Sequence, residues 1–176
     1  MLRKVHYSFD VLFTSNALDN DNIGGEAFHQ INPGVESAST KKGRVPAFTL
    51  ATEVLNGALR YHLNKRYIPT KPIPIDAEYN ENIYGEEDVD LGEVTLGKWE
   101  HFDVFIHEGY MKEHMPYLIV KRNGNVVYQS NEPNTYNVVT APQIRYGIYK
   151  AAYLPRYSPA ATRKRIIYFA NFKLEI

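Results

Sequence analysis

The sequence predicts an all-β fold, a jelly roll built as a sandwich of two antiparallel sheets. Polar and apolar residues alternate at period two along most of the chain, as they do in strands with one buried face. Two Asn-Gly pairs, at 56–57 and 123–124, separate alternating runs and are strong signals for tight hairpins. No long stretch has helical periodicity, so we expect residues 1–176 to form a single two-sheet domain.

The alternation places the strands in order. Tyr7, Phe9, Val11 and Phe13 form the apolar face of a first strand. Hairpins are expected across 48–63 and 118–129, and further strands at 98–108, 142–151 and 165–176. The acidic segment 79–93 interrupts this pattern and is expected to be a loop, with a short helix near 76–88.

The composition argues against several classes of function. Twenty Lys and Arg balance twenty Asp and Glu, so no overall field attracts nucleic acid or a membrane surface. The chain has no cysteine, and it has neither a Gly-rich phosphate loop nor a G-x-S-x-G nucleophile motif. No run of apolar residues is long enough for a membrane helix, and MLRKVHYSFDVLF lacks the pattern of a signal peptide. The cellular location and the oligomeric state stay open.

One strand has an unusual polar face. In PQIRYGIYKA, residues 142–151, alternation places Gln143, Arg145, Gly147 and Tyr149 on the face opposite the apolar residues. An amide, a guanidinium and a phenol therefore lie beside a glycine that leaves the backbone bare. A solvated sheet face with a glycine bulge is the simpler interpretation, and a binding site is the alternative.

The order of these segments resembles polysaccharide lyases with a concanavalin A-like jelly roll, the heparin lyase, glucuronan lyase and alginate lyase kind. The segments that carry the resemblance are GKWEHFDVFIHE, LIVKRNGNVVYQ, IRYGIYK and RIIYFANFKLEI, and upstream HYSFDVLF followed by AFHQINPG. It covers nearly the whole chain and implies cleavage of a uronic-acid polysaccharide by β-elimination. An acidic polysaccharide is therefore the expected partner, and no cofactor is required.

The implied chemistry explains the residue types. β-Elimination needs a donor that neutralises the uronate carboxylate, a base that removes the C5 proton and an acid that protonates the leaving oxygen. By resemblance, Tyr149 lies where the catalytic tyrosine is found and Arg145 lies near a substrate-binding lysine. Gln30 matches the glutamine of a Gln-x-His motif, and Asn32 stands where that motif has histidine. Tyr149 would then act as both base and acid, while Gln30 and Asn32 bind the carboxylate.

Three further residues are candidates for substrate binding. Gln143 shares the strand face of Arg145, and Arg60 and His62 lie on the strand after the first Asn-Gly turn. His62 could supply the imidazole that Asn32 lacks. The family's Arg-x-Glu strand has no counterpart in MLRKVHYSF, so we expect either a trimmed or divergent member or an incomplete site.

Other interpretations remain open. Gln30 and Asn32 could simply end a strand before the Asn-Pro-Gly turn at 32–34. A non-catalytic carbohydrate-binding or structural module is the main alternative function, and a glycoside hydrolase is weaker because no paired-carboxylate motif is recognisable. The run DNDNIGG at 19–25 does not fit an EF-hand loop, although a structural calcium is compatible with the resemblance. No other metal site is expected.

Overall fold

A computed structural model describes residues 3–14, 25–32, 46–67, 85–135, 143–149 and 166–175. Within these ranges the chain forms ten strands and one short 3-10 turn. They are β1 (Lys4–Phe13), β2 (Glu26–Asn32), β3 (Phe48–Leu55), β4 (Ala58–Tyr67), β5 (Gly85–Glu93), β6 (Trp99–His107), η3 (Lys112–His114), β7 (Tyr117–Arg122), β8 (Asn125–Ser130), β9 (Gln143–Tyr149) and β10 (Ile167–Glu175).

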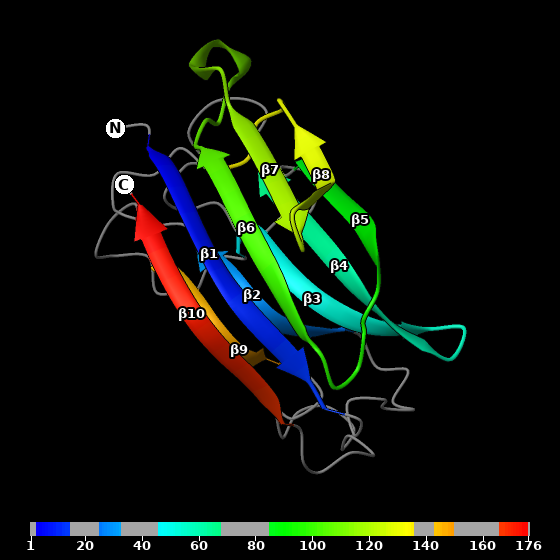
Figure 1. Ribbon diagram of the computed structural model, residues 1–176. Helices are drawn as coiled ribbons and strands as arrows, with labels where there is room; N and C mark the ends of the chain where they lie inside the picture. Colours follow the sequence, from blue (N-terminus) through cyan, green and yellow to red (C-terminus); the bar gives the residue numbers. More distant parts are fainter. Residues whose placement is uncertain are drawn as a thin grey trace, which may run out of the picture.

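The strands pair into two antiparallel sheets that pack face to face (Figure 1). The first sheet has the order β10-β1-β6-β7-β8, and the second has the order β5-β4-β3-β2-β9. This architecture confirms the predicted two-sheet jelly roll. The late strands β9 and β10 each join an edge beside an early strand, so residues far apart in sequence become neighbours.

The core lies between the sheets and follows from the alternation. Tyr7, Phe9, Val11 and Phe13 are at most 1% exposed, as the pattern of the first strand predicts. The aromatic rings of this strand contact aromatic residues of the second sheet; for example, the ring centroids of Phe13 and Phe28 lie 5.4 Å apart. Aromatic residues supply much of the buried apolar area, which drives the two sheets together.

Both predicted Asn-Gly hairpins are confirmed. Asn56 and Gly57 join β3 to β4, and Asn123 and Gly124 join β7 to β8. All four residues have positive φ angles, between 50° and 81°. Type I′ turns require this conformation at both central positions, and asparagine and glycine adopt it at low cost.

The expectation for the acidic segment is wrong over its described part. Gly85–Glu93 is strand β5, so 85–93 is not a loop and 85–88 is not part of a helix, whereas 76–84 lie outside the described residues. The alternation is present but carried by charges, since Glu86, Asp88 and Asp90 pair with outward-facing residues of β4. A charged edge strand is a common protection against edge-to-edge aggregation.

Candidate active site

The pairing of β2 with β9 brings five of the predicted site residues together. Gln30 lies opposite Arg145, Asn32 lies opposite Gln143, and Ala27 lies opposite Tyr149. Directly paired residues of an antiparallel ladder project to the same face. All five side chains therefore lie on the face of the second sheet that points away from the first, which we call the outer face.

A pocket of about 180 Å³ lies where this ladder is irregular. One residue of β2 and two of β9 separate the pair Ala27–Tyr149 from the pair His29–Tyr146. Gly147 in this interval has φ +136°, which strains any other residue, and a Cβ placed on it would meet nothing within 4 Å. The glycine therefore serves the backbone conformation and also leaves the space beside Tyr149 open.

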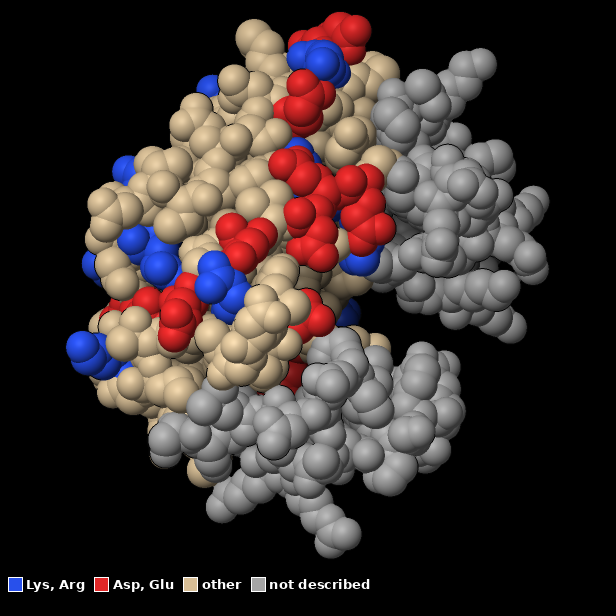
Figure 2. All heavy atoms as spheres, turned by 90° about the vertical axis from the view of Figure 1, so that its right-hand side faces the viewer, with Lys and Arg blue, Asp and Glu red and all other residues tan. Residues whose placement is uncertain are grey.

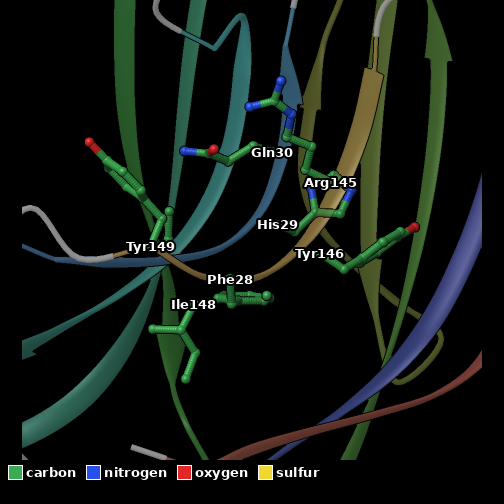
Figure 3. A pocket seen from close by; sticks show the side chains of 9 residues that line it. Phe28, His29, Gln30, Arg145, Tyr146, Ile148 and Tyr149 are labelled. Atoms are coloured by element: carbon green, nitrogen blue, oxygen red, sulfur yellow. The ribbon is translucent and has the colours of Figure 1, made fainter.

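Three polar groups surround this pocket. Figure 3 shows Gln30, Arg145 and Tyr149 projecting to one side of the β2–β9 ribbon, with Phe28 and Ile148 on the other side. The pocket is open to solvent at Tyr149, because this residue is 53% exposed. Within the described ranges the Gln30 amide forms no side-chain hydrogen bond, so its donors are available to a ligand.

Arg145 is held in place by its neighbours. Its Nη2 donates to Oε1 of Gln143 at 2.7 Å. With the Asn32 amide oriented so that its oxygen faces the guanidinium, Oδ1 accepts from Nε at 2.9 Å and from Nη1 at 3.0 Å. The side-chain oxygens of Asn32 and Gln143 are therefore both bonded to Arg145 and are not available to a ligand. A cation fixed in this way loses less entropy when it binds a carboxylate.

His62 and Arg60 lie on the same face but farther away. They belong to β4, which is separated from β2 by β3, so about 10 Å of sheet lies between β4 and β2. Arg60 Nε donates to Asp90 at 2.8 Å, and His62 Nδ1 lies 3.4 Å from Asp88 Oδ1. Both predicted binding residues are thus engaged with carboxylates of β5.

A row of small residues connects His62 to Tyr149. Along the ladders, Tyr149 pairs with Ala27, Ala27 with Ala51, and Ala51 with His62. Because alanine side chains are small, no large side chain rises from the sheet between the Tyr149 phenol and the His62 imidazole. Sequence alternation alone could not identify this row, because it depends on which strands are neighbours.

His29 faces the core, opposite to Gln30 and Asn32, as predicted. It is 1% exposed and stacks on Tyr7 and Phe9, with ring centroids 5.1 and 5.3 Å away. Neither ring nitrogen bonds another described residue. Burial lowers the pKa of His29 to about 3 and raises the pKa of its neighbour Tyr146 to about 12. His29 is therefore neutral and does not offer its imidazole to the outer face.

The acidic row of β5 is a feature that the sequence reading missed. Hydrogen bonds from Asn64 and from Arg66 hold the pKa of Glu86 below its usual value. The backbone N–H of Gly92 and the Arg60 guanidinium do the same for Asp90. These carboxylates are therefore ionised at neutral pH. The period-two spacing of 86, 88 and 90 was the signal that could have identified them as one face of a strand.

The described residues form neither a metal-binding cluster nor a membrane-spanning helix. They contain no group of three or more His, Asp or Glu side chains arranged to hold a metal ion. No helix in the described part of the chain is long and apolar enough to cross a membrane. The run 19–25, for which a structural calcium is only compatible with the resemblance, lies almost wholly outside the described residues.

Comparison with known proteins supports the fold. Neither family models nor curated protein sequences match the chain. Among solved structures it is similar to an endo-β-1,4-glucuronan lyase from Trichoderma reesei, with a TM-score of 0.71, 14% identity, and coverage of 99% of this chain and 69% of that one.

Two alginate lyases are similar as well. The enzyme from Aplysia kurodai has a TM-score of 0.55 and 16% identity over 99% of this chain and 70% of its own. The alginate lyase Aly36B, solved with an alginate trisaccharide, has a TM-score of 0.56 and 16% identity over 97% of this chain and 69% of its own. The resemblance seen in the sequence is thus confirmed as a resemblance of fold, and this chain is a divergent protein with the jelly-roll fold of the polysaccharide lyases.

Proposed function

We propose that the protein is a polysaccharide lyase that cleaves a uronic-acid polysaccharide by β-elimination on the outer face at β2 and β9. The observation that supports this most is the meeting of Gln30, Arg145 and Tyr149 around one pocket. The fold similarity to glucuronan and alginate lyases supports the same conclusion. An amide, a cation and a phenol are the groups that such an elimination uses.

Each group has a chemical role. Gln30 donates a hydrogen bond to the uronate carboxylate, and this bond strengthens as negative charge develops when the C5 proton leaves. Tyr149 removes that proton as phenolate and returns it to the glycosidic oxygen as the C4–O bond breaks. The products are a chain with a new reducing end and a chain that begins with an unsaturated uronate. Tyr149 ends the cycle in the state in which it began.

Arg145, Asn32 and Gln143 form a binding unit in this scheme. Arg145 and Tyr149 are four residues apart on β9, about 13 Å at strand rise, so they contact different parts of one oligosaccharide. Arg145 binds the carboxylate of a neighbouring sugar, and Asn32 and Gln143 hold the guanidinium for it. Asn32 is then a positioning residue, because it acts through Arg145.

A non-catalytic glycan-binding module is the second candidate. One observation favours it: Asn32 occupies the place where the resembling lyases have histidine, and its amide is bonded to Arg145. Within the described residues, the imidazole on the outer face is that of His62, on β4, three strands from Tyr149. A module would keep Arg145 and the pocket for binding without any proton transfer.

An ultraviolet absorbance assay for unsaturated uronate separates the two candidates. The substrates are glucuronan, alginate, hyaluronan, heparin and heparan sulfate. We expect absorbance to rise with at least one polymer, and Tyr149→Phe to abolish turnover while retaining binding. Tyr168→Phe is the matched control, because Tyr168 on β10 is 51% exposed but belongs to the other sheet. Binding without product for the wild type on every polymer would favour the module and refute the lyase.

A further inference from the structure

The outer face of the second sheet is divided by charge. Among the described residues of this face, β2 and β9 carry one charged side chain, Arg145. Its neighbours are amides, a phenol and small residues. On β3, β4 and β5 the same face carries five carboxylates against two guanidiniums. The carboxylates are Glu53, Glu86, Asp88, Asp90 and Glu93, and the guanidiniums are Arg60 and Arg66.

The two guanidiniums do not neutralise this half. Arg60 is paired with Asp90 at 2.8 Å and Arg66 with Glu86 at 2.7 Å. Asp88 Oδ1 lies 3.4 Å from Nδ1 of His62, and Glu53 Oε2 lies 4.0 Å from its Nε2. Among the described residues, no Lys or Arg is within ion-pair distance of either carboxylate. Figure 2, which faces the side of β5, shows the acidic side chains gathered in a band.

One extended ligand would meet both halves. From β9 to β5 there are four strand spacings, about 19 Å, along rows of paired residues that include the low floor of Ala27 and Ala51. A polymer with a carboxylate on every sugar gains from Arg145 at one end and is repelled by Asp88 and Glu53 at the other. Like charges placed together are a common means of rejecting a wrong partner.

We propose that the substrate carries a uronate over β2 and β9 and an uncharged or amino sugar over β4 and β5. This inference rests on the proposed lyase function and specifies its substrate class. It selects heteropolysaccharides in which uronates alternate with sugars that have no negative charge, in preference to homopolyuronates. The acidic half is thus a specificity determinant of the same face.

The test compares one polymer in two charge states. Glucuronan and the same glucuronan after partial carboxyl reduction share their linkage and differ only in charge density. We expect kcat/KM per remaining uronate to be higher for the reduced polymer. Asp88→Asn should raise kcat/KM on intact glucuronan about fivefold, the factor that corresponds to one like-charge contact of about 1 kcal/mol at the surface. Glu113→Gln, an exposed carboxylate in η3, is the control.

Ionic strength provides a second readout. Raising the salt from about 0.01 M to about 1 M shortens the screening length from about 30 Å to about 3 Å and should narrow the difference between the polymers. Equal kcat/KM for both polymers, together with no effect of Asp88→Asn, would overturn the inference while leaving the lyase intact. Absence of product from both polymers and from every other polymer of the panel would refute the lyase instead. Calorimetric affinities for the same polymers then decide the charge preference, and equal affinities would overturn it.

Discussion

The buried imidazole of His29 makes the stability of the protein sensitive to acid. His29 is enclosed by Tyr7 and Phe9 of β1, Phe48 of β3 and Tyr146 of β9, and burial lowers its pKa to about 3. The folded protein therefore keeps this ring neutral at a pH where the unfolded chain, with the ordinary pKa of about 6.5, has bound a proton. Stability contributed by the neutral ring is present above pH 6.5 and is lost progressively as pH falls toward 3.

The size of this loss follows from the two pKa values. Each pH unit between them costs about 1.4 kcal/mol, so His29 alone should lower the free energy of unfolding by about 2 kcal/mol between pH 8 and pH 5. The total at pH 3 would be about 5 kcal/mol, a large fraction of the stability of an ordinary domain. The substitution His29→Phe keeps a planar ring in the aromatic cluster and removes the proton-binding group.

Urea unfolding measured at about pH 8 and about pH 5 gives the result. Between pH 8 and pH 5 the free energy of unfolding should fall by about 2 kcal/mol more in the wild type than in His29→Phe. The carboxylates and the other histidines contribute equally to both proteins, so their effect cancels in this comparison. His114→Phe, at a partly buried position in η3, controls for the loss of a histidine as such. Parallel losses in wild type and His29→Phe would refute the claim that burial keeps His29 neutral.

Two further substitutions test other contacts. Asn32→Ala removes the acceptor of two Arg145 hydrogen bonds, so KM for oligosaccharides should rise several-fold with little change in kcat. A fall in kcat as large as that of Gln30→Ala would show that Asn32 contacts the reacting sugar instead. Asn134→Ala removes the buried amide that bonds His107 O, Tyr117 O and Gly109 N at 2.9 to 3.1 Å. Leaving these backbone groups unpaired should cost about 2–4 kcal/mol in thermal or urea unfolding, and an unchanged midpoint would contradict the role given to this amide.

The strands and the faces of individual strands could be predicted because they depend on neighbouring residues. Period two fixes which side of a strand Arg145 and Tyr149 occupy, and Asn-Gly fixes two turns by its φ preferences. Strand order depends instead on contacts between distant segments. The pairing of β2 with β9, which assembles the candidate site, is therefore absent from any local pattern.

The bulge in β2 shows where alternation fails. Counting back from Gln30 by two would put Phe28 on the outer face, yet Phe28 and His29 are both 1% exposed. One extra residue separates the pairs Ala27–Ala51 and His29–Leu50, so two successive side chains enter the core. Ala27 then takes the outer position, where its small side chain leaves the floor beside Tyr149 low. A period-two pattern has no means of predicting an inserted residue.

The same irregular strand pair connects the candidate site to the buried histidine. Among the described strands β9 pairs with β2 alone, and it is anchored to the core through Tyr146, whose ring lies 4.9 Å from His29 and 5.2 Å from Phe9. A proton on His29 would place an unpaired charge against this anchor. Arg145 and Tyr149 flank Tyr146 in sequence, so their placement depends on the same contact. Acid should therefore disturb the binding face at the β2–β9 pair before it disturbs the β7–β8 hairpin at the far edge of the first sheet.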